Sequence, residues 1–185
     1  KECPRGLRER QHELSRYLRR GSWTTLAAHP GLAQTFGYVV AAQLDEYSRL
    51  YGSKPARIDG HHHAHLCANV LVQRLLPPGT IVRRNFSFQA GEKSVWNRMY
   101  RKLIDRALAR RHHLADFFFS LAPIDRPSRL PRIFGLARNS VVEVETHPTE
   151  PSEYRFLQSG EIFDWLDGAV PVRPSLLLER RTARN

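Results

Sequence analysis

Helical and strand-like hydrophobic patterns alternate along the chain, and this alternation constrains the fold more than any other feature. The clearest helix is predicted over residues 94–111, where apolar residues recur at i, i+3 and i+4 and arginines occupy the opposite face. A second amphipathic pattern ends at Gly52, a residue suited to terminating a helix. In full, helices are predicted over residues 7–20, 36–50, 68–76, 94–111 and 161–168.

Runs of β-branched and aromatic residues lie between these helices and predict strands. A segment rich in proline and arginine, residues 123–134, is expected to be a loop. The alternation predicts an α/β fold with a parallel sheet, in which functional residues gather at the C-terminal ends of strands. The predicted strands span residues 56–66, 80–88, 115–121 and 140–148.

Composition indicates one domain that does not span a membrane. A chain of 185 residues with 41% hydrophobic content is long enough for one real core, and no shift in composition divides it. No apolar run approaches the roughly 18 residues of a membrane span. The two cysteines, Cys3 and Cys67, have no CxxC spacing and are too few for a disulfide framework. A cytoplasmic location is therefore expected.

The net charge of +11 raises the question of a nucleic-acid partner. Only four of the 29 basic residues are lysine, and the arginines are scattered along the whole length. Such a surplus of arginine is typical of genome base composition or of a solvated surface. No zinc-finger spacing, helix-turn-helix or aromatic-basic strand pattern accompanies the charge, so nucleic acid is not the expected partner.

The segment Asp59-Gly-His-His-His-Ala-His65 places four histidines in five positions at the end of a predicted strand. If that strand continues through the segment, Asp59, His61, His63 and His65 share one face, because side chains alternate along a strand. Imidazoles at this spacing can converge on an ion such as Zn²⁺, with the carboxylate as ligand or orienting group. The alternative is a group of histidines packed at the strand end; the number of histidines favours a metal or catalytic site.

A second histidine, His147, lies where another predicted strand ends. Alone it is as typical of a loop as of a site, but near a metal-bound water it could act as the general acid that protonates a departing amine. Glu143 and Glu145 alternate along the same strand and could serve as base or orienting carboxylates. The equally open alternative for both glutamates is a position that faces solvent.

The motif IDGHHHAHLCANV resembles the HxDSHHHVHxxP pattern of the YdjC-like deacetylases, which include chitooligosaccharide deacetylases and hopanoid-associated members. Further segments resemble that family in the same order, and the resemblance covers residues 36–172. These segments are the helix in VVAAQLDEYSRLYGSKPARID, the strand TIVRR, the segment RRHHLADFFFSL and the strand-to-helix stretch VVEVETHPTEPSEYRFL.

The resemblance implies a metal-dependent hydrolase that removes the acetyl group of an N-acetylated sugar or glycolipid. It implies an irregular (β/α) barrel of the polysaccharide-deacetylase-like kind and a divalent ion, Mg²⁺ or Zn²⁺. By resemblance, His61 is the first candidate ligand, with His63 and His65 as further ligands or supporting side chains. Asp59 orients them, Arg83 or Arg84 holds the substrate or oxyanion, and His147 is the acid for the leaving amine.

The chain departs from the family over residues 1–35, which lack the family's N-x-D-D-F-G and G-x-H-x-x-L-T motifs. Position 57 is arginine where the family has histidine. A single deacetylase-like domain over residues 1–185, incomplete at its N-terminal side, is expected. Either a homo-oligomer or a second chain then completes the barrel, or the chain is a shortened, non-catalytic homologue that acts as a binding or scaffold subunit through its basic surface.

Overall fold

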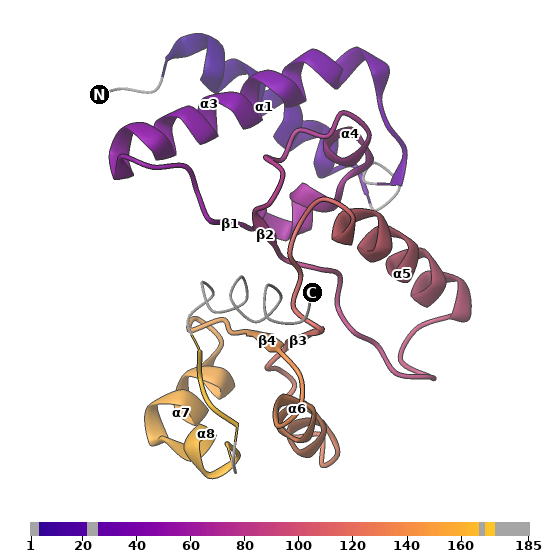
Figure 1. The fold of residues 1–185 in the computed structure, drawn as a ribbon, viewed down its shortest axis with the longest axis vertical. Coiled ribbons are helices and arrows are strands. Elements are labelled where there is room, and N and C mark those ends of the chain that lie inside the picture. Colours follow the sequence, from indigo (N-terminus) through magenta and orange to yellow (C-terminus); the bar gives the residue numbers. More distant parts are fainter. Residues whose placement is uncertain (1–3, 22–25, 167–168, 173–185) are drawn as a thin grey trace. The chain divides into compact units, whose positions relative to one another are not determined.

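The computed structural model describes residues 4–21, 26–166 and 169–172, and the chain divides into two compact units, residues 1–82 and 83–185 (Figure 1). Each unit combines helices with one short parallel sheet, so the predicted α/β class is confirmed. None of the described helices has both the length and the apolar content needed to cross a membrane.

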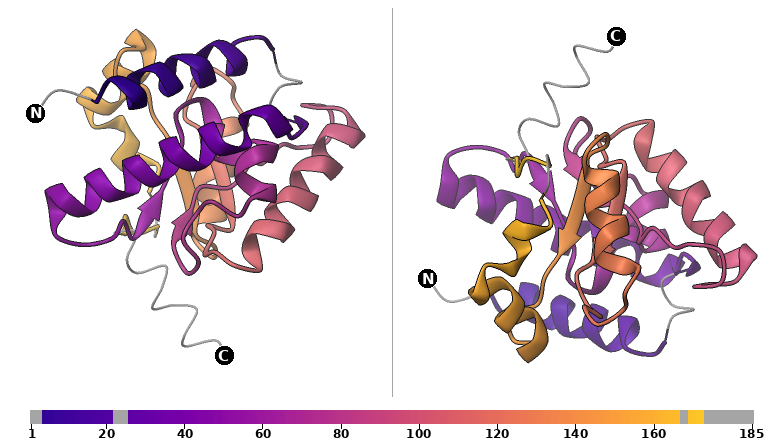
Figure 2. Two further views of the ribbon diagram at one scale, coloured as in Figure 1. Left: turned by 90° about the horizontal axis from the view of Figure 1, so that it is seen from above. Right: turned by 90° about the horizontal axis from the view of Figure 1, so that it is seen from below.

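The two longest helices of the first unit are α1 (Arg5–Leu18) and α3 (Ala33–Tyr51), the latter preceded by the 3₁₀ helix η1 (Pro30–Leu32). They lie side by side (Figure 2), and buried apolar residues of both helices, among them Leu14, Phe36 and Val39, form this part of the core. Both helices were predicted. Helix α3 ends as expected at Gly52, whose φ of 69° is a left-handed conformation that glycine adopts without strain.

The sheet of the first unit is much smaller than its sequence predicts. Strand β1 (Arg57–Ile58) pairs in parallel with β2 (Ile81–Val82), with Arg57 opposite Ile81 and Ile58 opposite Val82. The connection contains the 3₁₀ helix η2 (His61–Leu66) and the short helix α4 (Ala68–Val72). Ile81 and Val82 are fully buried, which explains the strong apolar signal of so short a strand.

The second unit is built on β3 (Phe117–Ser120) and β4 (Val142–Glu145), which pair in parallel from Phe117 opposite Val142 to Ser120 opposite Glu145. Helix α6 (Arg129–Ala137) lies in the connection. The prediction of a loop over residues 123–134 is therefore wrong in its second half. Pro131 misled that prediction, but a proline in the first turn of a helix forfeits no intrahelical hydrogen bond.

The core of the second unit lies between the sheet and helices α6, α7 (Pro151–Ser159) and α8 (Glu161–Asp164). Strands β3 and β4 and helix α8 were predicted directly, whereas a helix at α7 was implied only by the family resemblance. The buried residues of this core are Phe119, Leu121, Leu130, Ile133, Phe134 and Phe156.

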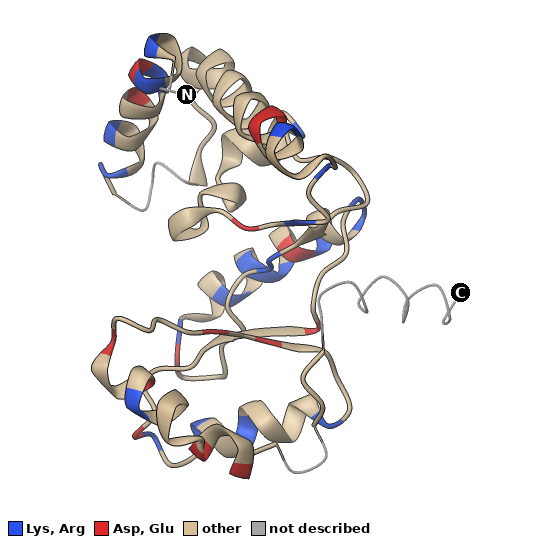
Figure 3. Ribbon diagram, turned by 90° about the vertical axis from the view of Figure 1, so that its left-hand side faces the viewer, with Lys and Arg blue, Asp and Glu red and all other residues tan. Residues whose placement is uncertain are grey.

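Helix α5 (Val95–Ala109) forms where the strongest helical pattern predicts it, with the hydroxyl of Ser94 accepting the Asn97 N–H at 3.2 Å. Its apolar stripe, however, is largely exposed: Trp96 is 79% and Leu103 65% accessible. Basic and acidic residues are interspersed over the described parts of both units (Figure 3). The exposed apolar stripe of α5 is thus more unusual for a protein surface than the charged residues of the same helix.

Candidate functional site

The histidine-rich segment does not continue the strand. Strand β1 ends at Ile58, and His61–Leu66 form the 3₁₀ helix η2, which is kinked at His62 (φ 49°) and His63 (φ 58°). The prediction that His61, His63 and His65 share one face of a strand is therefore wrong. Two successive left-handed residues turn the chain sharply, which a strand does not do.

His65 is the one histidine of this segment that is buried, with 4% of its surface accessible. Its Nδ1 accepts the backbone N–H of Gly60 at 2.9 Å, and Asp59 Oδ1 lies 3.9 Å from the same nitrogen. A Cβ on Gly60 would come within 2.6 Å of the His65 backbone nitrogen, so only glycine fits there. Gly60 and His65 thus close the turn that follows β1.

His61 and His62 are exposed, and their ring centroids are 4.0 Å apart. Together with Asp59 and Ile58, they border a cavity of about 1080 Å³ within the first unit. Apolar side chains of α1 and α3 form much of its lining. The segment therefore combines one structural histidine, His65, with two accessible ones, His61 and His62, and the half-buried His63.

The side chains of this segment do not fit a complete metal site. Among the described residues, no three His, Cys, Asp or Glu side chains are placed to hold one ion. The Gly60 N–H occupies the Nδ1 lone pair of His65, which puts the proton of the neutral ring on Nε2. Burial raises the pKa of the nearby Cys67 thiol, which disfavours the thiolate that binds metals.

In the second unit, Arg83 is held by both glutamates of β4. Its Nε donates to Glu143 Oε1 at 2.6 Å and its Nη1 to Glu145 Oε1 at 2.8 Å. The two glutamates share one face of the strand, as their alternation predicts, and both side chains are less than 20% accessible. The alternative that they face solvent is therefore wrong. The guanidinium also lies 4.8 Å from the ring centroid of Phe118.

His147 lies just beyond the C-terminal end of β4, between two carboxylates. Its Nε2 is 3.9 Å from Glu145 Oε2 and its Nδ1 is 3.6 Å from Glu153 Oε1, while 55% of its side chain is accessible. Both distances exceed hydrogen-bond length, so neither carboxylate is hydrogen-bonded to the ring. An exposed imidazole flanked by carboxylates is suited to giving or taking a proton.

Glu153 was not singled out from the sequence, although it positions His147. This glutamate is fully buried and accepts the backbone N–H of His147 at 2.5 Å and that of Ala122 at 3.2 Å. It is the third residue of α7, after Pro151 at the first position. A proline followed two residues later by a glutamate is a sequence signal for a helix start. It places the carboxylate at the third helical position.

Arg84 is bound within the second unit rather than directed to His147. Its Nη2 and Nε donate to Asp105 Oδ2 at 2.9 and 3.1 Å, and its Nη1 donates to the carbonyls of Ala115 and Asp116. Asp105 belongs to α5 and is nearly buried, so these contacts tie the helix to the segment before β3. Of the two arginine candidates, Arg83 is the one that shares a carboxylate, Glu145, with His147.

The predicted site residues are thus divided between the two units. Asp59, His61, His63 and His65 lie in the first, and Arg83, Arg84 and His147 in the second. No protein-family model, curated protein or solved structure matches the chain.

Proposed function

We propose that the chain is an amide hydrolase that removes the acetyl group from an N-acetylated sugar or glycolipid, in the manner of the YdjC-like deacetylases it resembles. The observation that carries the proposal is the arrangement around His147. This half-exposed imidazole follows a parallel strand and stands between Glu145 and Glu153. Strand ends of this kind are where α/β enzymes bring catalytic groups together.

In this proposal His147 supplies the proton that the departing amine requires. Glu153 holds the backbone of His147 through its N–H, and Glu145 lies on the other side of the ring. Arg83 occupies the other oxygen of Glu145, which fixes that carboxylate beside the ring. The positive Arg83 guanidinium is also a candidate to stabilise an oxyanion.

The divalent ion, Mg²⁺ or Zn²⁺, stays a prediction that rests on the resemblance. Because the described donors do not fit a complete site, no step of the proposed reaction is built on it. His61 is the best remaining candidate ligand because its ring is exposed and is not the one bonded to Gly60. Metal analysis of the purified chain and of His61→Ala measures this directly, and equal metal content in both removes His61 from the ligand set.

The proposal includes a (β/α) barrel completed by a second copy of the chain or by another chain. Strand β1 pairs only with β2 among the described strands, which leaves a short sheet that could be extended. Exposed apolar side chains on α5, such as Trp96 and Leu103, are also typical of surfaces that bind a partner. Light scattering after gel filtration measures whether the chain self-associates.

Acetate release from N-acetylglucosamine oligomers, with Mg²⁺ or Zn²⁺ added, tests the function. His147→Ala is expected to lower kcat by about 10²- to 10⁴-fold, the usual contribution of a general acid. The matched control is His12→Ala, which removes an exposed histidine of α1 and is expected to leave kcat unchanged.

Two results would contradict the proposal: full activity in His147→Ala, or no acetate release by the wild-type chain. The alternative function is a non-catalytic binding or scaffold subunit that uses the basic surface of a chain with a net charge of +11. Salt-dependent binding of anionic polymers without any acetate release would support that alternative.

A further inference from the structure

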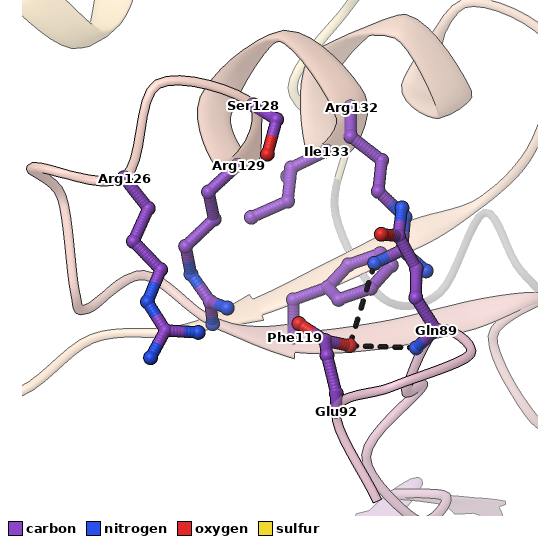
Figure 4. A pocket seen from close by; sticks show the side chains of 8 residues that line it. All are labelled: Gln89, Glu92, Phe119, Arg126, Ser128, Arg129, Arg132 and Ile133. Carbon is purple, nitrogen blue, oxygen red and sulfur yellow. Dashed lines mark hydrogen bonds and ion pairs between the residues drawn. The ribbon is translucent and has the colours of Figure 1, made fainter.

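Three arginines, none of which has a role in the function proposed above, surround a small cavity in the second unit (Figure 4). The cavity measures about 190 Å³ and lies beside the first turn of α6. Phe119 and Ile133, both buried, supply its apolar wall. The residues that line it are Gln89, Glu92, Phe119, Arg126, Ser128, Arg129, Arg132 and Ile133.

Arg129 is held in place by the end of strand β3. Its Nη2 donates to the Ser120 carbonyl at 2.5 Å and its Nε to the Leu121 carbonyl at 3.3 Å. Neither acceptor is a carboxylate, so the charge of the guanidinium is oriented without being neutralised. Burial, the largest cause, and the neighbouring Arg126 and Arg132 act to lower the pKa of Arg129, whereas Glu92 and Glu153 act to raise it.

Arg132 is fixed on the opposite side of the cavity. Its guanidinium lies 5.0 Å from the ring centroid of Phe119, and its Nη1 is 3.7 Å from Glu92 Oε2. With the Gln89 amide oriented to satisfy its hydrogen bonds, the Gln89 oxygen accepts from Arg132 Nε at 2.7 Å. Glu92 is the single carboxylate among the lining residues, so three guanidinium groups face one negative charge.

Arg126 completes the group from the loop before α6. Its side chain extends in the same direction as that of Arg129 (Figure 4), and it is exposed. Within the described part of the chain, no hydrogen bond or ion pair engages its guanidinium. Two arginines directed the same way repel each other unless an anion lies between them.

We propose that Arg126, Arg129 and Arg132 form a binding site for the phosphate group of a phosphorylated compound. Guanidinium forks match the several oxygens of a phosphate dianion, and the dianion balances the excess of two positive charges. Whole ligands fill pockets of about 300 to 1,000 Å³, so a smaller cavity suits one charged group of a larger molecule. The group can belong to a sugar phosphate or to a lipid headgroup.

Isothermal titration calorimetry of the full chain with inorganic phosphate tests the site. Wild-type protein is expected to bind, and Arg126→Gln to weaken binding about tenfold, as the loss of one charge-assisted hydrogen bond does. Arg126→Glu is expected to abolish binding. The matched control is Arg155→Gln, which removes an exposed arginine of α7 in the same unit and is expected to leave phosphate affinity unchanged.

Two further probes identify the source of the phosphate. Tighter binding of glucose 6-phosphate than of inorganic phosphate assigns the site to small phosphorylated compounds. Binding to phosphatidylcholine vesicles only when they contain phosphatidic acid assigns it to a lipid headgroup. The proposal is overturned if none of the three probes binds, or if Arg126→Gln and Arg155→Gln weaken binding equally. All of these measurements are made without turnover, so they are independent of the proposed hydrolysis.

Discussion

The two histidine motifs of this chain both follow predicted strands but occupy different environments. In the first unit, His65 is buried and its Nδ1 is bonded to the Gly60 backbone. In the second unit, His147 is half exposed and its ring faces two carboxylates. The segment with four histidines thus forms a turn, while the single histidine lies accessible beside two carboxylates.

The difference shows that the number of histidines in a segment predicts a functional site less well than the contacts of each imidazole ring do. A histidine bonded to a neighbouring backbone group stabilises local structure, whereas an accessible one can contact other molecules. Each of the following changes tests one side of this contrast.

The largest effect on stability is expected from the carboxylate behind His147. Glu153→Ala removes a buried acceptor of two backbone N–H groups, so the free energy of unfolding should fall by about 3 kcal/mol. Urea denaturation followed by circular dichroism measures the change. Glu150→Ala, an exposed neighbour, serves as the control and should cost less than about 0.5 kcal/mol. Equal losses in the two variants would show that Glu153 does not hold the segment around His147.

A smaller loss of stability is expected from a change at Gly60, in the turn of the first unit that contains His65. An alanine Cβ there would lie 2.6 Å from the backbone nitrogen of His65, so Gly60→Ala should lower the free energy of unfolding by about 2 kcal/mol. Gly37→Ala is the matched control, because its Cβ would meet nothing within 4 Å inside helix α3. This control should gain about 0.5 to 1 kcal/mol. A harmless Gly60→Ala would mean that the turn is not closed by His65.

A substitution at a left-handed residue of η2 is expected to raise the stability of the protein rather than lower it. His62→Gly should raise the free energy of unfolding by about 0.5 to 1 kcal/mol, because glycine adopts a φ of 49° without strain. His61, equally exposed but with helical dihedrals, is the control, and His61→Gly should lower stability slightly. The same denaturation experiment compares them. If His62→Gly is the less stable variant, His62 has a stabilising role that the turn alone does not explain.

The smallest effect concerns a third histidine environment, at His112 in the second unit. Burial first, and then Arg111 and His113, lower the pKa of His112, so the folded protein binds its proton less readily than the unfolded chain. Its contribution to stability is present above pH of about 6.5 and is lost as the pH falls through the lowered folded value. His112→Gln should therefore reduce the loss of thermal stability below that pH. The melting temperatures of both proteins are measured across this pH range. An identical dependence of melting temperature on pH in the two proteins would contradict the prediction.

The sequence predicted helices better than strands. Helices α1, α3 and α5 were found because each repeats its apolar residues over several turns, a pattern set by local geometry. Strand β2 was predicted as nine residues but spans Ile81–Val82, because pairing with β1 limits its length. Helix α6 was missed because Pro131 reads as a helix breaker when its place in the first turn is unknown.

For the candidate site, the sequence identified His147, Arg83 and Glu145 but not how they are connected. Arg83 and Glu145 are 62 positions apart in the chain, so no local pattern links them. Glu153 escaped notice because its function depends on Ala122 and His147, which reach it only in the folded unit.

The sequence by itself determined the periodicities of the long helices, the alternation of helices with short strands, and the residue types that proton transfer requires. These follow from side-chain spacing and chemistry, which act over a few neighbouring residues. Only the tertiary structure decided that His65 closes a turn, that His147 stands between two carboxylates, and that three arginines share one cavity. Such arrangements depend on hydrogen bonds and charges between segments far apart in the chain, and these form only when the segments pack together.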